Sequence, residues 1–195
     1  MTRIVGGAAR GRRLRVSATG TRPTSDRARE AVFSSLESQR GGLSGSWVID
    51  LYAGSGAMGL EALSRGAAGV DLVERDRGAL AAIEANVESL SLPGAHVHRA
   101  DVEQWVQGRT QVSQPPQSAD VVFVDPPYDV PAEDLADVLA ALGESGRIAP
   151  GAWVVVERSR RADDFSWPTG FSADRHRRYG EAVLWFGRFD SVATC

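Results

Sequence analysis

A pair of prolines between an acidic and an aromatic residue is the part of this sequence best suited to chemistry. The tetrad Asp125-Pro126-Pro127-Tyr128 follows an apolar run at 121–124 that is typical of a short buried strand. Prolines offer backbone carbonyls but no N–H groups, and they do not continue a central strand. The tetrad therefore predicts a loop rich in hydrogen-bond acceptors beside an aromatic face. Such a loop suits a planar group that carries an amino group, such as a nucleobase or an amide.

A glycine-rich segment provides a second candidate site. Gly54, Gly56 and Gly59 satisfy the pattern G-x-G-x-x-G after an apolar run, and Glu74 lies twenty residues after Gly54. By pattern alone this indicates a dinucleotide site of the NAD type, with glycines beside the ligand and an acid on the ribose. Any adenosine-bearing cofactor can use the same two features.

Two further acids favour a cationic cofactor over NAD. Asp50 precedes the first glycine by four residues, which places a carboxylate where the pyrophosphate of NAD would lie. Asp101 follows the third predicted strand, where an acid can accept a hydrogen bond from an adenine amino group. A helix N-cap is the alternative role for Asp101, and a solvated surface charge is the alternative for Glu74. Together the three acids indicate S-adenosylmethionine.

Cysteine and histidine give no sign of a metal site or a disulfide. The single cysteine, Cys195, is the last residue, and His96, His98 and His176 do not have metal-ligand spacing. The chain has no apolar stretch long enough for a membrane span and no signal-peptide core at its start. We therefore expect a cytoplasmic protein with no metal and no membrane partner.

Arginines are concentrated near the start of the chain. The net charge is −3, but residues 1–40 hold nine arginines and three acids, which leaves −9 for the rest. Genomic base composition explains why all 22 cations are arginine, but it does not explain this clustering. A basic segment on an acidic body predicts contact with nucleic acid. The expected contacts are Arg3, Arg10, Arg12, Arg13, Arg15 and Arg22.

The elements that would position these residues alternate between strand and helix. This alternation predicts an α/β fold with a mostly parallel sheet. The expected strands are 47–51, 70–74, 95–99, 120–124 and 152–157, with a closing hairpin at 172–179 and 182–188. The expected helices are near 57–66, 76–90, 101–107 and 132–143.

The first forty residues form a separate unit in this interpretation. Residues 3–16 are expected to form a hairpin, and a helix at 26–38 begins after the N-cap Ser25. The Gly/Ser-rich stretch at 41–46 is the expected boundary. We therefore expect a basic RNA-contacting extension at 1–40 and a cofactor-binding domain at 41–195.

These motifs resemble those of the class I S-adenosylmethionine-dependent methyltransferases. Residues 50–56 resemble their cofactor motif, and residues 125–128 resemble the motif for methylating amino groups. The resemblance is closest to the RsmD family, the bacterial 16S rRNA guanine-N2 methyltransferases, and it covers nearly the whole chain. The matching segments are 3–7, 10–14, 22–27, 29–30, Phe33, 50–56, 59–66 and 179–180.

The resemblance implies a Rossmann-like fold with a seven-stranded, mostly parallel sheet and helices on both faces. It implies that S-adenosylmethionine is converted to S-adenosylhomocysteine. The partner would be 16S rRNA in the small ribosomal subunit or its assembly intermediate, and we expect a monomer. The implied catalytic residues are Asp125, Pro126, Pro127 and Tyr128. The implied cofactor residues are Asp50, Tyr52, Ala53, Gly54, Ser55, Gly56, Glu74, Arg75, Asp101 and Val102.

Four other functions remain open on the residues alone. The same tetrad serves DNA methyltransferases that act on adenine N6 or cytosine N4, although the chain leaves little room for a target-recognition domain. A protein glutamine amide is another possible amino-group substrate, disfavoured by the basic segment. The remaining alternatives are a non-catalytic RNA-binding protein with a relic cofactor fold and an NAD oxidoreductase.

Overall fold

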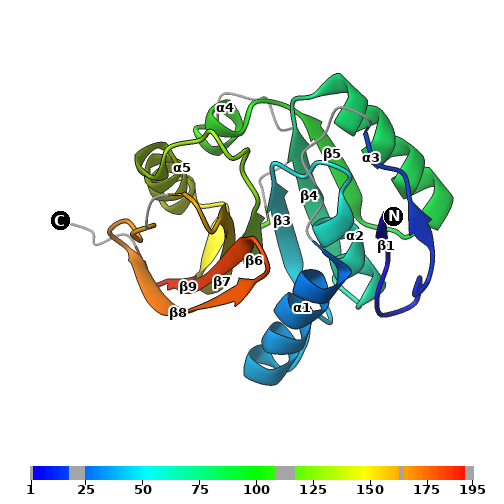
Figure 1. Ribbon diagram of the computed structural model, residues 1–195, viewed down its shortest axis with the longest axis horizontal. Coiled ribbons are helices and arrows are strands. Elements are labelled where there is room, and N and C mark those ends of the chain that lie inside the picture. The colour runs from blue at the N-terminus through cyan, green and yellow to red at the C-terminus, as the bar shows by residue number, and fades with distance from the viewer. Residues whose placement is uncertain (1, 18–24, 109–116, 163–164, 192–195) are drawn as a thin grey trace.

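A seven-stranded sheet forms the centre of the computed structural model, which describes residues 2–17, 25–108, 117–162 and 165–191 (Figure 1). The strand order is β5-β4-β3-β6-β7-β9-β8. The five strands from β3 to β7 are parallel, whereas β9 runs antiparallel to both of its neighbours. The strands are β3 (Trp47–Leu51), β4 (Gly69–Glu74), β5 (Ala95–Arg99), β6 (Ala119–Val124), β7 (Ile148–Ser159), β8 (Phe171–Tyr179) and β9 (Ala182–Phe189). The predicted class, a mostly parallel seven-stranded α/β sheet, is confirmed.

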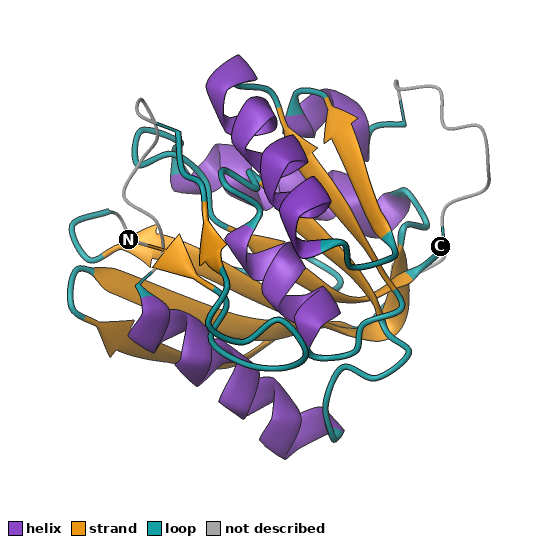
Figure 2. Cartoon of the chain, turned by 90° about the vertical axis from the view of Figure 1, so that its right-hand side faces the viewer, coloured by secondary structure: helices purple, strands orange, loops and turns teal. Residues whose placement is uncertain are grey.

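Helices cover both faces of this sheet (Figure 1). One face carries α1 (Asp26–Arg40), α2 (Ala57–Ser64) and α3 (Arg77–Leu90). The other face carries α4 (Val102–Val106) and α5 (Ala132–Glu144). The strands change direction progressively across the sheet, which is the twist expected of a sheet of this size (Figure 2).

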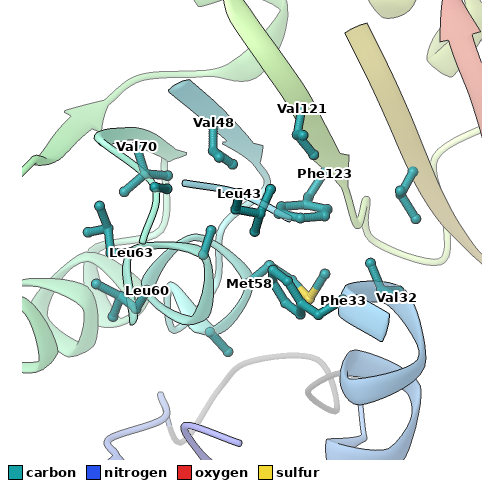
Figure 3. Packing of buried hydrophobic residues seen from close by; sticks show 14 of the residues in the cluster. Val32, Phe33, Leu43, Val48, Met58, Leu60, Leu63, Val70, Val121 and Phe123 are labelled. Atoms are coloured by element: carbon teal, nitrogen blue, oxygen red, sulfur yellow. The ribbon is translucent and has the colours of Figure 1, made fainter. Parts of the chain in front are cut away.

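The core on the α1–α3 face joins residues from across the sequence. Phe33 of α1 meets Phe123 of β6 edge-on, with ring centroids 5.5 Å apart. Leu60 of α2 and Val70 of β4 belong to the same buried cluster (Figure 3). Burying such side chains stabilises the fold by about 1.5–3 kcal/mol each. The core therefore holds α1 against the central strands.

One strand differs from its prediction by more than one residue at an end. The strand β7 begins at Ile148, four residues before the predicted start at 152, and it ends at Ser159. Ala119 pairs with Ile148, and the register then shifts so that Val121 pairs with Trp153. An irregularity of this kind accommodates Pro150 inside a strand, where a proline usually ends pairing.

The amino-terminal residues form the predicted hairpin. Its strands β1 (Thr2–Arg3) and β2 (Arg13–Leu14) pair antiparallel. Ile4 and Leu14 are buried in the cluster that also contains α1, α2 and the central strands. The described residues before position 41 thus share a core with the rest of the sheet. The division into 1–40 and 41–195 stays a prediction.

A buried carboxylate attaches this hairpin to the sheet. Glu61 of α2 has no exposed surface, and its two oxygens accept hydrogen bonds from the N–H groups of Val5 and Gly6, each at 2.7 Å. The same carboxylate forms ion pairs with Arg65 at 2.8 Å and with the fully buried Arg29 at 3.6 Å. The charge therefore has several partners, as burial of a carboxylate requires.

No helix among the described residues is both long and apolar enough to cross a membrane.

Replacing Glu61 should destabilise the whole fold. Glu61→Ala leaves the buried Arg29 guanidinium with Asp26 as its remaining carboxylate partner, and it leaves the N–H groups of Val5 and Gly6 without their acceptor. Removing one partner of a buried pair typically costs about 3–5 kcal/mol. Urea unfolding measures the change. Glu144→Ala, at an exposed position on α5, is the matched control and should change the free energy of unfolding little. Equal stability of the two variants would contradict the role assigned to Glu61.

Candidate active site

The predicted site residues gather at one edge of the sheet. The strands β3, β4, β5 and β6 are parallel, so the segments that follow them meet at their carboxyl ends. After β3, the chain adds β4 and β5 on one side of β3 and then β6 on the other side, so the strand order reverses at β3. Ligands of open α/β sheets bind at such a switch point.

A cavity of about 320 Å³ lies at this edge. Its volume is within the range of ligand pockets. It contains residues from the glycine-rich segment, from the tip of β4, from the start of α4 and from the proline tetrad. The lining residues are Tyr52, Gly54, Glu74, Arg75, Asp76, Ala79, Ala100, Val102, Asp125 and Pro127. The two sites that the sequence suggests separately thus share one cavity.

The glycine-rich loop has an unusual backbone. Gly54 and Gly56 have φ angles of +58° and +75°, and Tyr52 has a φ of +59°. A positive φ is strained for a bulky residue and is found mostly where a site requires it. The Tyr52 hydroxyl donates to Glu103 at 3.1 Å. Ala53 donates to the carbonyl of Val73 at 3.0 Å, so the loop is held against β4.

The carboxylate of Glu74 organises the tip of β4. It accepts hydrogen bonds from the N–H groups of Gly54, Arg75 and Asp76, each at 2.8 Å. These bonds hold the carboxylate at the cavity in one orientation. Because a carboxylate can accept about four hydrogen bonds, the three leave room for a ligand hydroxyl.

Asp50 lies beneath the loop. Its side chain is 2% exposed and accepts a hydrogen bond from the N–H of Gly59 at 2.8 Å. The pKa of Asp50 is raised to about 7, mainly by burial; the hydrogen bond from Gly59 lowers this pKa and the nearby charge of Glu74 raises it. Asp50 does not line the cavity. Its contact with a cofactor stays a prediction.

The third glycine of the motif serves helix packing. A Cβ atom on Gly59 would lie 2.6 Å from the Leu72 Cδ2 atom and 2.7 Å from the Val70 Cγ2 atom. Only glycine allows α2 to approach β4 this closely. Close packing of helix and strand is the role expected for the last glycine of such a motif.

Asp101 occupies the N-cap position of α4 beside the cavity. It forms an ion pair with Arg75 at 2.9 Å. Its hydrogen bond with Glu103 and then that with Arg75 lower the pKa of Asp101, whereas the bond with Asp101 and burial raise the pKa of Glu103. Its neighbours Ala100 and Val102 line the cavity, and Asp101 does not.

The proline tetrad separates two cavities. Asp125 and Pro127 line the first, and Tyr128, which is 60% exposed, lines a second cavity of about 620 Å³. The bond from the N–H of Val130 to the carbonyl of Pro127, at 3.1 Å, turns the loop after the tetrad. The residues of the second cavity are Ser25, Arg27, Tyr128, Glu157, Arg158, Arg178, Tyr179, Gly180, Glu181 and Ala182.

Comparison with known proteins shows to which family this chain belongs. The family model described as "Conserved hypothetical protein 95" matches residues 2–188. Ribosomal RNA small subunit methyltransferase D of Escherichia coli strain K12 is 34% identical over 182 residues, which cover 93% of this chain and 86% of that protein. The chain belongs to the RsmD family.

Solved structures agree with membership of the RsmD family. YhhF from Escherichia coli has a TM-score of 0.81 and 30% identity, and the match covers 97% of this chain and 98% of that chain. SMU.776, solved in complex with SAH, is 11% identical with a TM-score of 0.61, and the match covers 75% of this chain and 46% of that chain. The latter likeness shows the fold alone. The fold is that of a class I methyltransferase.

The arginines predicted to contact nucleic acid lie apart from the proline tetrad. Arg3, Arg10, Arg12, Arg13 and Arg15 are exposed, and none of these five lines either cavity. The Arg3 side chain contacts Asp26 at 3.2 Å, and Arg12 donates to the carbonyl of Ser89 at 2.6 Å. Arg22 lies outside the described residues. Their contact with nucleic acid stays a prediction.

A buried amide connects this basic segment to the glycine-rich loop. Asn86 of α3 is 1% exposed. Its side chain accepts from the N–H of Arg15 at 2.7 Å and donates to the carbonyls of Arg15 and Ser55, each at 2.9 Å. The sequence gives no signal for Asn86, because an asparagine within a helix is usually a surface residue.

Among the described residues, no group of three His, Cys, Asp or Glu side chains could hold a metal ion.

The raised pKa of Asp50 predicts a pH-dependent stability. Its pKa is 3.8 as an ordinary value and about 7 in the fold. The folded state therefore binds the proton more tightly than the unfolded state, so this carboxyl contributes stability below pH 4 that is lost as the pH rises to about 7. Asp50→Asn keeps an acceptor for Gly59 but does not titrate.

The effect is measured by urea unfolding of the native protein and of Asp50→Asn at about pH 4.5, 6 and 7.5, which span this pH range. The stability of the native protein relative to the variant should fall as the pH rises. A constant difference across the three pH values would contradict the raised pKa of Asp50.

Proposed function

We propose that this chain transfers a methyl group from S-adenosylmethionine to the exocyclic N2 of a guanine in 16S rRNA. The observation that carries the proposal is the position of the tetrad Asp125–Tyr128 between two cavities. One cavity is lined by acids and by Gly54 of the glycine-rich loop, which suits an adenosine site. The other has an exposed tyrosine and arginines, which suit a nucleotide. The name of the Escherichia coli relative supports an rRNA substrate, and guanine N2 follows from the resemblance in sequence.

The charge of the first cavity suits S-adenosylmethionine, and its volume lies within the range of ligand pockets. Glu74, Asp76 and Asp125 line it against one cation, Arg75. This excess of acid suits a cationic ligand and disfavours a diphosphate. Glu74 would hold the ribose hydroxyls, and the apolar surfaces of Ala100 and Val102 would lie against the adenine. When bound, S-adenosylmethionine supplies a methyl group on a positively charged sulfur.

The tetrad would position the amino group that accepts the methyl. The lone pair of guanine N2 is delocalised into the ring, which makes the nitrogen a poor nucleophile. The Asp125 carboxylate and the Pro126 carbonyl accept hydrogen bonds from the two N–H groups of this nitrogen. These bonds direct the lone pair toward the methyl donor. Asp125 or water takes the released proton. Most of the rate then comes from positioning and electrostatics.

Tyr128 would hold the target base. Its ring is 60% exposed and lines the second cavity. An aromatic side chain at this place can stack on a base that has left its helix. Such stacking is worth about 1–3 kcal/mol per base. The tyrosine thus presents the base to Asp125 from the side opposite the cofactor cavity.

The substrate is tested with labelled S-adenosylmethionine. The protein is incubated separately with unmethylated small ribosomal subunits, naked 16S rRNA and duplex DNA, and the products are digested to nucleosides. Labelled N2-methylguanosine from the ribosomal substrates alone is the expected result. Label in adenine or cytosine of the DNA would replace the proposal with a DNA amino-methyltransferase. A protein that binds no S-adenosylmethionine would indicate a non-catalytic RNA-binding protein.

Replacing Asp125 should separate catalysis from binding. Asp125→Ala removes the acceptor for the guanine amino group, and the methylation rate should fall on the order of 10²-fold or more. Calorimetry should show that the variant still binds S-adenosylmethionine. Asp129→Ala, at an exposed position four residues further on that lines neither cavity, is the matched control. Unchanged turnover in Asp125→Ala would refute the acceptor role.

A further inference from the structure

A groove runs from the tetrad along α1 and β8. It consists of the second cavity and an adjoining hollow of about 390 Å³. Tyr179 lines both, so the two adjoin at this side chain. The lining residues of the hollow are Ala31, Ser34, Ser35, Ser38, Gln39, Arg175, Arg177, Tyr179 and Phe186. We call the whole depression the α1–β8 groove.

The α1 wall of the groove is polar and made of small side chains. Ala31, Ser34, Ser35 and Ser38 follow helical spacing after Arg27. The opposite face of the helix is buried in the core through Val32, Phe33 and Leu36. The small residues keep the groove open for roughly 16 Å along the helix from Arg27 to Ser38, at 1.5 Å per residue.

The β8 wall is attached to α1 by one arginine. Arg175 contacts Asp174 and the Ser35 hydroxyl, and its guanidinium lies 4.7 Å from the ring centroid of Phe186. These contacts keep α1 and the end of β8 side by side (Figure 1). Arg175 thus fixes the width of the groove.

Three other arginines of the groove are available to a ligand. Arg27, Arg177 and Arg178 are exposed. None of their three side chains forms a hydrogen bond or an ion pair with another residue of the described part of the chain. Arginines without acidic partners along a groove are typical of contacts with phosphates.

The groove leads to the reacting residues. Arg27 and Arg178 line the same cavity as Tyr128. Arg158, which is 6% exposed, donates to the carbonyl of Val130 at 2.8 Å and supports the loop that carries the tetrad. Because successive side chains of a strand point to opposite faces, Arg177 and Arg178 extend from opposite sides of the edge strand β8; Arg177 lines the hollow and Arg178 lines the cavity of Tyr128. An RNA strand held by both would therefore pass along the edge of β8 and arrive at Tyr128.

We propose that the α1–β8 groove binds the RNA strand that flanks the target guanine. Arg27, Arg177 and Arg178 contact its phosphates, while Tyr128 stacks on the target base. The proposal rests on the function proposed above and adds the surface that reads the substrate. The occupant is single-stranded, because a base can reach an exposed aromatic ring only when it is unpaired.

A double variant tests this surface. Arg177→Ala/Arg178→Ala should raise the Kd for naked 16S rRNA and for a single-stranded ribo-oligonucleotide about tenfold at moderate salt. The slope of log K against log salt should decrease by roughly 1.4, at about 0.7 for each lost phosphate contact of a single strand. The affinity for S-adenosylmethionine and the thermal midpoint should stay the same.

A matched control removes the same charge at the other edge of the sheet. Arg77 and Arg99 are exposed and line a shallow hollow beside α3 and β5. Arg77→Ala/Arg99→Ala should bind both RNAs like the native protein. The groove is overturned if the two double variants lose equal affinity, or if Arg177→Ala/Arg178→Ala keeps the native Kd and salt slope. Tighter binding of duplex RNA than of the single strand would also overturn it.

The two proposals fail in different ways. Native protein that forms N2-methylguanosine while the groove variant binds RNA normally contradicts the groove and leaves the function intact. Native protein that forms none, while the groove variant still loses RNA affinity, contradicts guanine-N2 transfer and supports the groove as an RNA surface.

Discussion

The placement of the amino-terminal hairpin and α1 depends on one carboxylate that is fully shielded from water. Glu61 accepts the N–H groups of Val5 and Gly6 and balances Arg29 and Arg65. Arg29 in turn donates to the carbonyl of Arg3 at 2.6 Å, and Arg65 reaches acids on α1. One charge thus joins the hairpin, α1 and α2. Because α1 forms a wall of the groove beside the tetrad, this network also supports the surface proposed to bind RNA.

The site combines parts with different mechanical properties. The acceptor loop and the carboxylate of Glu74 lie at the ends of buried parallel strands and are held by backbone hydrogen bonds. The walls of the groove are side chains on a helix and on an edge strand. Rigid strand ends suit a reaction that depends on alignment. Surface side chains suit a partner whose phosphates are held mainly by charge.

Much of the fold was predictable because its signals are local. The runs at 47–51 and 95–99 become β3 and β5 with the same bounds, and Ser25 caps α1 through a bond to the N–H of Ala28. Acids at strand tips were also readable, because parallel strands bring their carboxyl ends together. The early start of β7 was not, since Pro150 suggests a strand end and only the register shift against β6 accommodates it.

The parts of the site that the sequence did not indicate depend on contacts between distant segments. Arg27 and Arg178 belong to separate stretches and meet the predicted Tyr128 only in the fold. The density of arginines near the start drew attention to the hairpin, whereas Arg177 and Arg178 are a short pair in a strand. The carboxylate of Asp50 accepts a hydrogen bond from Gly59 beneath the loop, and its contact with the ligand stays a prediction.

Asn86 links two events that are usually considered separately. A single buried amide holds both the backbone of Arg15 and the carbonyl of Ser55 in the cofactor loop. Through this shared amide, a ligand that shifts one segment would also act on the other. Such coupling is reciprocal: if bound cofactor strengthens the attachment of RNA by some factor, bound RNA strengthens that of the cofactor by the same factor. The departure of the spent cofactor and the release of the modified RNA would then be thermodynamically connected through one side chain.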